Sequence, residues 1–183
     1  MGTGSALPQA TVTNDDLSKI MDTSDEWIRT RAGIETRHLA QEETTVSLSV
    51  EAARRALCDS GISAEELDFI IVGTVTGDNV TPSCACSVQA ALGARRAAAF
   101  DINAACSGFL FALNTAYAYV NAGIYRTGLI IGAEVLSRIM DWTDRSTCVL
   151  FGDGAGAAVV QAADRGLIRF EQGSDGERGA VLA

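Results

Sequence analysis

The sequence predicts an α/β layered domain with a largely buried sheet. Segments with apolar residues at helical spacing alternate along the chain with short, continuous runs of β-branched residues. No internal repeat or linker interrupts this alternation. Strands and helices that take turns are typical of domains in which helices cover a sheet. With 183 residues, the chain is long enough for one such domain with a real core.

Two short helices are expected first. Asn14 or Thr13 is the expected cap of a helix over 14–21, and Ser24 is the expected cap of a second helix over 25–31. Each of these residue types can accept a hydrogen bond from an unpaired amide in the first turn of the helix.

A longer helix over 46–61 follows. Its apolar residues recur at helical spacing and Gly61 provides a typical end; the core-facing residues are Leu48, Ala52, Ala56 and Leu57. Ser63 and Glu66 then form a capping-box pattern that leads into a strand over 67–76. The continuous β-branched run in this strand predicts that it is buried.

The remaining elements are expected as helices over 82–93 and 107–122 and strands over 97–103, 127–135 and 155–163. Thr81 followed by Pro82 is the expected cap of the first of these helices, because proline suits the first helical position. The helix over 107–122 is apolar nearly all round, which predicts burial inside the protein.

Composition excludes several classes of function. Fourteen basic and 23 acidic residues give a net charge of −9, which argues against nucleic acid or an anionic membrane as the general partner. No run approaches the ~18 apolar residues of a membrane span, and no signal peptide is visible. The local basic residues, which a solvated face would also explain, are Arg29, Arg31, Arg37 and His38.

Five cysteines without paired spacing favour a reduced, cytoplasmic compartment. Cys84 and Cys86 would lie on different faces of a helix, and the chain has one histidine, so we expect no metal site. The glycine-rich segment 151–158 lacks the spacing of a phosphate loop and precedes a strand, so its glycines are expected to serve tight turns.

Cys106 stands between an expected strand and an apolar helix, with small residues on both sides. The unpaired amides and positive end of a helix favour a thiolate and lower a thiol pKa. The same amides can hold the oxyanion that forms when a thioester is attacked. A nucleophile and an ordinary small buried cysteine are both open interpretations of this position.

The segment around Cys106, "DINAACSGF", resembles the active-site segment of the β-ketoacyl-acyl-carrier-protein synthase III family of the thiolase-like superfamily. Other segments resemble that family in the same order, among them "GTGSALP", "DTSDEWIRTRAGIETRH", "TPSCAC" and "DWTDRSTCVLFGDGAGAAVV". The resemblance implies a thiolase-like layered α-β-α-β-α fold. Residues 1–183 would form its amino-terminal half, with a mixed, largely buried sheet and a central helix that starts at the nucleophile.

The resemblance also implies the initiating condensation of fatty-acid synthesis. Acyl-coenzyme A would acylate Cys106, and malonyl-acyl carrier protein would then lose carbon dioxide and condense to give 3-ketoacyl-acyl carrier protein. Acyl-coenzyme A is a substrate here, and no covalently bound cofactor is implied. A cytoplasmic homodimer, paired near the strand over 97–103, is expected as well.

Four residues match the family's coenzyme A site by position. Trp27 matches the aromatic residue on which the adenine stacks, and Arg145 matches the arginine on the other side of the ring. Arg31 matches a residue near the phosphates and Thr23 one near the adenine. Tryptophan and arginine planes suit an adenine, and arginine forks suit phosphate. A helix anchor for Trp27 and a surface ion pair for Arg145 are the ordinary alternatives.

The family mechanism needs a histidine and an asparagine that belong to its carboxy-terminal half. The only histidine in the sequence, His38, matches a non-catalytic position and is expected to be structural. The 183-residue chain is therefore expected to be inactive without the missing half. Thr81 falls where the family often has a larger side chain that reaches the partner's acyl pocket, and the preferred acyl group is not predicted.

Two other functions remain open at this point. One is another acyltransferase of the thiolase superfamily, of the polyketide type or similar to hydroxymethylglutaryl-coenzyme A synthase. The other is a non-catalytic fragment that binds coenzyme A, which is how the chain without its catalytic histidine would behave.

Overall fold

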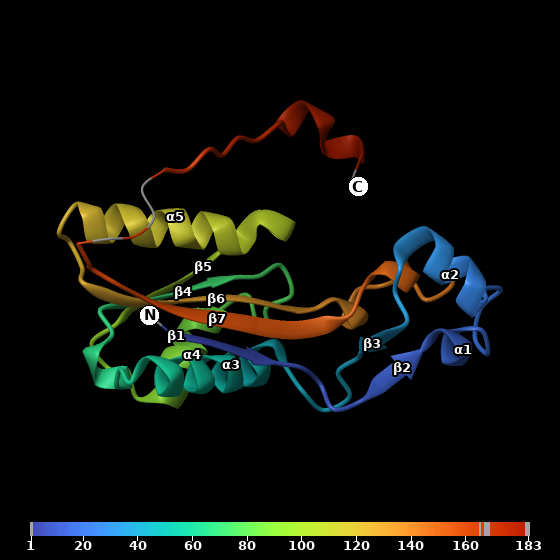
Figure 1. Cartoon of the computed structure of the whole chain (residues 1–183), viewed down its shortest axis with the longest axis horizontal. Coiled ribbons are helices and arrows are strands. Elements are labelled where there is room, and N and C mark those ends of the chain that lie inside the picture. The colour runs from blue at the N-terminus through green and yellow to red at the C-terminus, as the bar shows by residue number, and fades with distance from the viewer. Residues whose placement is uncertain (1, 165, 167–168, 182–183) are drawn as a thin grey trace.

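A five-stranded sheet forms the centre of the computed structural model, which describes residues 2–164, 166 and 169–181 (Figure 1). The strands lie in the order β1-β7-β6-β4-β5. Their bounds are β1 Gly2–Ala6, β4 Phe69–Gly73, β5 Ala98–Ile102, β6 Thr127–Val135 and β7 Asp153–Gln161. β4 is parallel to both β5 and β6, whereas β7 is antiparallel to β6 and β1. The predicted mixed sheet is confirmed.

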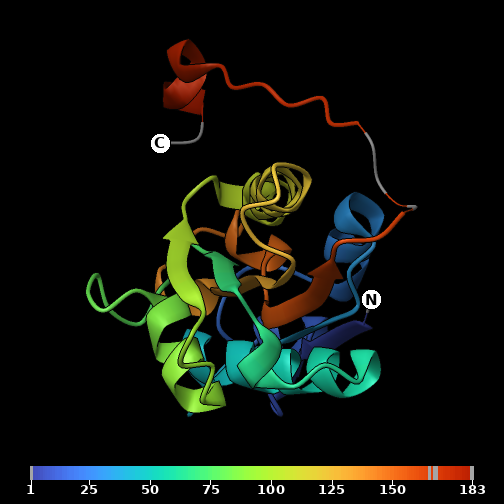
Figure 2. The ribbon, with the colours of Figure 1, turned by 90° about the vertical axis from the view of Figure 1, so that its left-hand side faces the viewer.

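Helices cover both faces of this sheet. The helices α3 (Thr45–Ser60) and α4 (Cys84–Leu92) lie on one face, and α5 (Gly108–Asn121) lies on the other (Figures 1 and 2). This arrangement gives an α-β-α sandwich. It agrees with the layered fold that the sequence predicts.

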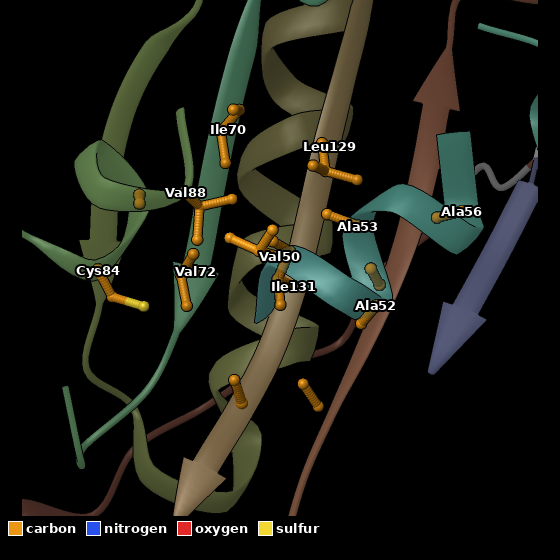
Figure 3. Packing of buried hydrophobic residues seen from close by; sticks show 14 of the residues in the cluster. Val50, Ala52, Ala53, Ala56, Ile70, Val72, Cys84, Val88, Leu129 and Ile131 are labelled. Atoms are coloured by element: carbon orange, nitrogen blue, oxygen red, sulfur yellow. The ribbon is translucent and has the colours of Figure 1, made fainter. Parts of the chain in front are cut away.

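The side chains of β4 alternate between the two faces, as expected for a strand. Ile70 and Val72 point to the side of α3 and α4, where they pack with Val50 and Val88 (Figure 3). Phe69 belongs to the cluster under α5. Every residue of β4 is buried, so its continuous apolar run is explained by cover on both sides.

The four residues expected to face the core from the long helix, Leu48, Ala52, Ala56 and Leu57, are all buried. Small residues let this helix approach β1 closely, since a Cβ on Gly4 would clash with the carbonyl oxygen of Ala52. The helix ends where Gly61 adopts φ 69°, a left-handed conformation that suits glycine.

A smaller unit extends from one end of the sandwich (Figure 1). It contains a two-stranded antiparallel ribbon, β2 Thr11–Thr13 and β3 Thr36–His38, and the helices α1 Asn14–Leu17 and α2 Asp25–Ala32. The sequence did not predict the ribbon, because three-residue strands carry almost no periodic signal. The first helix is shorter than expected and is capped by Thr13, while Ser24 caps α2 as predicted.

Short 3-10 turns connect these elements: η1 Ala64–Glu66, η2 Ala105–Ser107, η3 Leu136–Arg138 and η4 Cys148–Leu150. A fifth, η5 Gly176–Val181, follows β7. The capping box between Ser63 and Glu66 is confirmed at the start of η1. None of the described helices is long and apolar enough to cross a bilayer.

Two expectations about boundaries were wrong. Ser83, not Thr81, caps α4, and the first amides of α4, those of Cys84 and Ala85, each donate to the Asp101 carboxylate at 2.7 Å. The helix begins where that carboxylate from β5 can accept those donors.

The second error concerns the glycine-rich segment. β7 begins two residues earlier than expected, so Gly154, like Gly156, lies inside the strand and not in a turn. An added Cβ at Gly154 would lie 3.0 Å from Cδ2 of the exposed, flexible Leu7 side chain, whereas its distance of 3.4 Å from the carbonyl oxygen of Ala6 is ordinary contact.

The helix α5 buries only one stripe of its apolar surface, formed by Gly108, Ala112 and Ala116. Leu110, on its outer side, is 55% exposed, so one face of this apolar helix is uncovered within the described chain. The segment after β7 crosses above the helix (Figure 1). It contacts α5 where the ring centroids of Phe170 and Tyr117 are 5.3 Å apart.

Candidate active site

Cys106 lies in η2, the turn that joins the end of β5 to the start of α5. Its side chain is exposed. The sulfur is therefore neither sealed in the interior nor placed in the middle of a helix, and both of those placements would have contradicted a nucleophilic role.

A strained residue shapes this turn. Ala105 has φ 45° and is the one non-glycine residue with positive φ in the part of the chain that the structure describes. This conformation is unfavourable for a residue with a Cβ, and such strain is found preferentially at functional sites. The turn brings Cys106 to the tip of a sharp strand-to-helix corner.

The corner sits at the carboxyl ends of three parallel strands. Gly73 ends β4, pairs with Ile102 at the end of β5, and pairs with Gly132 near the end of β6. A Cβ on Gly73 would lie 2.7 Å from the carbonyl carbon of Gly108, so the first turn of α5 rests directly on the end of β4. Ligands of α/β proteins commonly bind outside the carboxyl ends of such strands.

The backbone around Cys106 leaves a donor free for a ligand. The Ser107 amide donates to the carbonyl oxygen of Ala104 at 3.0 Å, and the Gly108 amide donates to that of Ala105. The amide of Cys106 donates to no acceptor among the described residues. An amide beside the sulfur, at the positive end of a 14-residue helix, can hold a developing oxyanion.

The structure brings Trp27, Arg31 and Arg145 together. The Cζ atom of Arg31 lies 4.4 Å from the centroid of the Trp27 ring, and that of Arg145 lies 5.1 Å from it. Trp27 and Arg31 belong to α2, whereas Arg145 belongs to the segment between β6 and β7. Arg145 is held by the main-chain carbonyl of Asp22 and by the Asp22 carboxylate at 3.1 Å.

Thr23 follows directly after Asp22. Its Oγ1 is buried and has no hydrogen-bond partner among the described residues, so it is a polar atom available to a ligand. Thr81 lies elsewhere, exposed in the connection between β4 and α4. No hydrogen bond within the described residues joins Thr81 to the Cys106 turn.

His38 has a structural partner, since its Nδ1 lies 2.7 Å from the carbonyl oxygen of Pro8. A solvated face was one interpretation of the local basic residues, and it does not hold for Arg37, which is 5% exposed. Its guanidinium donates to neutral oxygens, including Oδ1 of Asn14 at 2.8 Å. Neither Arg37 nor Asn14 was singled out as a site residue from the sequence. Buried arginines leave no local pattern that would have found them.

The buried thiols, Cys84 and Cys148, differ from the exposed Cys106 in their surroundings. Burial raises the pKa of the Cys84 thiol to about 12, and burial also raises the pKa of Cys148. Both side chains are therefore held as neutral thiols at ordinary pH. Cys58 and Cys86 are exposed.

Solved structures identify the class of protein. A 3-oxoacyl-[acyl-carrier-protein] synthase III from Aquifex aeolicus superposes with a TM-score of 0.88 and 54% identity, covering 90% of this chain and 53% of that chain. The priming β-ketosynthase of the R1128 polyketide pathway gives a TM-score of 0.87 and 41% identity, covering 90% of this chain and 49% of that one. The fold is that of the thiolase-like condensing enzymes.

Sequence comparison finds similar proteins in one family of this class. The pattern of 3-oxoacyl-[acyl-carrier-protein (ACP)] synthase III matches residues 100–176. A β-ketoacyl-[acyl-carrier-protein] synthase III of Clostridium acetobutylicum is 55% identical over 177 residues, which are 96% of this chain and 54% of that protein. One from Bordetella petrii is 55% identical over 188 residues, 99% of this chain and 57% of that protein.

The chain is thus related over nearly its whole length to the β-ketoacyl-[acyl-carrier-protein] synthase III family, as the sequence predicts. It spans about half the length of the curated relatives that it matches.

Proposed function

We propose that the protein catalyses the initiating condensation of fatty-acid synthesis, and that residues 1–183 form the amino-terminal half of the enzyme. Acyl-coenzyme A acylates Cys106, and malonyl-acyl carrier protein then condenses with the acyl group. The observation that carries this proposal is the exposed sulfur of Cys106 at the strand-to-helix corner, in a chain related to synthase III enzymes.

In the first step, the Cys106 thiolate attacks the thioester carbonyl carbon of acyl-coenzyme A. A new carbon–sulfur bond forms, the bond to coenzyme A breaks, and coenzyme A leaves as its thiolate. The positive end of α5 and the free amide of Cys106 support this step, because both stabilise negative charge. Ala105 and Ser107 are small enough to let a thioester approach.

In the second step, the malonyl group loses carbon dioxide, and the carbanion that remains attacks the acyl carbon on Cys106. The product is 3-ketoacyl-acyl carrier protein, and the cysteine thiolate is released. The histidine and asparagine that assist this step in the family are assigned to the carboxy-terminal half. We therefore propose that the 183-residue chain alone does not complete the reaction.

The group formed by Trp27, Arg31 and Arg145 is proposed to bind coenzyme A. The adenine stacks on the Trp27 ring, with Arg145 on its outer side, and Arg31 serves the phosphates. The Cζ atom of Arg145 lies 5.1 Å from the centroid of the Trp27 ring. The Arg145 side chain must therefore move outward to let the adenine enter between the guanidinium and the ring. Thr23 supplies the unpaired Oγ1 as a hydrogen-bond partner for the adenine.

A second copy of the chain is proposed to pair along β5. This strand lies at the edge of the sheet, with β4 on its only paired side among the described residues. Thr81 is proposed to reach the partner's acyl pocket from the nearby connection. Free cysteines throughout the sequence support a reduced, cytoplasmic compartment.

A polyketide-type condensing enzyme is the second candidate. The similarity to the R1128 priming β-ketosynthase favours it, since the TM-score of 0.87 nearly equals the 0.88 of the Aquifex enzyme. The two candidates share the acylation of Cys106 and differ in the acyl group and carrier protein that they accept. Turnover of the complete protein with acetyl-, branched- and longer-chain acyl-coenzyme A, on both kinds of carrier, separates them.

The deciding experiment is intact-mass analysis after incubation with acetyl-coenzyme A. The complete protein is expected to gain one acetyl group, which peptide mapping assigns to Cys106. Cys106→Ser abolishes the gain, and the matched variant Cys86→Ser, at another exposed cysteine, retains it. Acetylation that persists in Cys106→Ser would contradict the proposal.

A further inference from the structure

The guanidinium of Arg37 is buried without a carboxylate partner among the described residues. Arg37 is 5% exposed. Its guanidinium donates to the carbonyl oxygens of Val12 and Val149, each at 3.3 Å, and to Oδ1 of Asn14 at 2.8 Å. Burial lowers the pKa of Arg37, although it does not remove the charge at ordinary pH. A buried charge with only neutral acceptors adds little stability. Its structural role is therefore to hold the segments that carry those acceptors in fixed positions.

Asn14 continues this network into α2. The residue is 1% exposed, and its Nδ2 donates to the Asp25 carboxylate at 2.8 Å and to the carbonyl oxygen of Ile34 at 2.7 Å. Asp25 is the first residue of α2, and Ile34 comes just after the glycine that caps its end. One carboxamide therefore holds both ends of the helix that carries Trp27.

Arg37 continues the network in the other direction. Val149 belongs to η4, and the neighbouring amide of Cys148 donates to the carbonyl oxygen of Asp144 at 3.1 Å. This turn is the one that carries Arg145. The single guanidinium of Arg37 is thus bonded to the turn behind Arg145 and, through Asn14, to the helix behind Trp27.

We infer that Arg37 and Asn14 are positioning residues for the slot between Trp27 and Arg145. They fix the turn 144–149 against α2, so that the two planar side chains meet at a set separation. The inference rests on the proposed function, because the ligand that the slot would take is the adenine nucleotide of coenzyme A. Neither residue is expected to touch that ligand.

The inference predicts a loss specific to the nucleotide. The test compares two acyl donors on the complete protein: acetyl-coenzyme A, and the acetyl thioester of pantetheine, which lacks the nucleotide. In both Arg37→Met and Asn14→Asp, KM for acetyl-coenzyme A is expected to rise about tenfold, because the variant binds this substrate more weakly before the reaction. The value of kcat/KM for the pantetheine thioester is expected to stay unchanged. Asn14→Asp keeps an acceptor for Arg37 but cannot donate to Asp25 or Ile34.

Two further variants separate positioning from stability. Arg37→Lys keeps the charge but lacks the planar fork that bonds several oxygens at once, so it is expected to fold and to restore only part of the affinity. Thr127→Val is the matched control. It removes a buried hydroxyl that accepts a hydrogen bond from Gln161 at 3.1 Å, at the start of β6 and far from α2 along the molecule (Figure 1). It is expected to lower the melting temperature without changing the ratio of the two donors.

Each outcome decides the inference. A rise in KM confined to acetyl-coenzyme A supports it, whether seen in Arg37→Met or, if that variant does not fold, in Asn14→Asp and Arg37→Lys. Equal losses with both donors, or no loss with either, overturn it and leave the proposed function standing. If the unaltered protein uses both donors equally well, the slot does not bind the nucleotide, and the proposed coenzyme A site falls together with the inference.

Discussion

Gly73 and Gly108 meet backbone to backbone where β4 ends and α5 begins. A Cβ on Gly73 would lie 2.7 Å from the carbonyl carbon of Gly108, and a Cβ on Gly108 would lie 3.3 Å from the Cα of Gly73. This contact fixes the height of the first turn of α5 above the sheet. The position of Cys106, two residues before Gly108, depends on it.

Gly73→Ala is therefore expected to displace the start of α5. A methyl group cannot fit against the Gly108 backbone, so we expect a loss of about 1–3 kcal/mol in the free energy of unfolding and slower acylation of Cys106. Urea unfolding and intact-mass kinetics measure the two effects. Gly156→Ala is the control, because a Cβ there meets no atom within 4 Å. Equal stability of the two variants would show that the contact is not tight.

The cysteines are expected to differ in their reaction with iodoacetamide. Cys106 should react first, because its exposed sulfur lies at the strand-to-helix corner between the small residues Ala105 and Ser107, and the exposed Cys58 and Cys86 should follow. Cys84, with its pKa raised to about 12 by burial, and the buried Cys148 should remain unmodified at pH 8. Peptide mapping over a time course gives the order. If Cys106 reacts with iodoacetamide no faster than Cys58, its position at the corner does not increase the reactivity of its thiol.

The Trp27 ring is expected to supply much of the affinity for coenzyme A. Stacking of a base on an aromatic ring contributes about 1–3 kcal/mol, so Trp27→Ala should weaken binding by about one to two orders of magnitude, and Trp27→Phe should restore part of the loss. Calorimetric titration of the complete protein with coenzyme A measures this. Trp142→Phe is the matched control: Trp142 packs against the same apolar cluster as Trp27, but its indole Nε1 donates to the carbonyl oxygen of Ser137 at 3.3 Å. Unchanged affinity in Trp27→Ala would remove the ring from the site.

Asp78 is expected to make the protein less stable at acid pH. Burial would raise its pKa, but hydrogen bonds from Arg138 and from the amides of Val46 and Thr45 outweigh burial, so the pKa lies below its usual 3.8. A carboxylate with a depressed folded-state pKa stabilises the protein above about pH 4, and this stabilisation is lost as the pH falls below that value.

Asp78→Asn should therefore cost about 1–3 kcal/mol at pH 7 and should flatten the loss of stability below pH 4. Urea unfolding from pH 3 to pH 7 is the measurement. Glu42→Gln, at an exposed carboxylate, should leave the curve unchanged. If the free energy of unfolding of Asp78→Asn falls as steeply below pH 4 as that of the unaltered protein, other groups cause the acid sensitivity.

Much of the sandwich could be predicted because its elements carry strong local signals. The strand Thr127–Val135 has the predicted bounds, and Gly61 ends its helix as expected. Helical spacing also identified the core face of the long helix. The boundary of α4 was missed because its start is set by Asp101, a residue on another strand that accepts its first amides.

The candidate site divides in the same way. Cys106 could be placed from its own neighbours, because a strand, a run of small residues and an apolar helix follow one another in the sequence. The contact between Trp27 and Arg145 could be expected only through resemblance to a family, since many residues separate the two along the chain. The burial of Arg37 was not predicted, because it depends on the ribbon and on the turn at Val149, neither of which has a local signal.

By itself, the sequence determined the order of the strands and helices that follow the ribbon, the core-facing residues of α3 and the corner at which Cys106 stands, because these follow from periodicity and capping over a few neighbouring residues. Tertiary structure alone decided which side chains from distant segments meet: Arg145 over Trp27, and one buried guanidinium behind both. Such contacts depend on how the ribbon, α2 and the turn before β7 pack against one another. That packing is the sum of many weak contacts, and no short stretch of sequence encodes it.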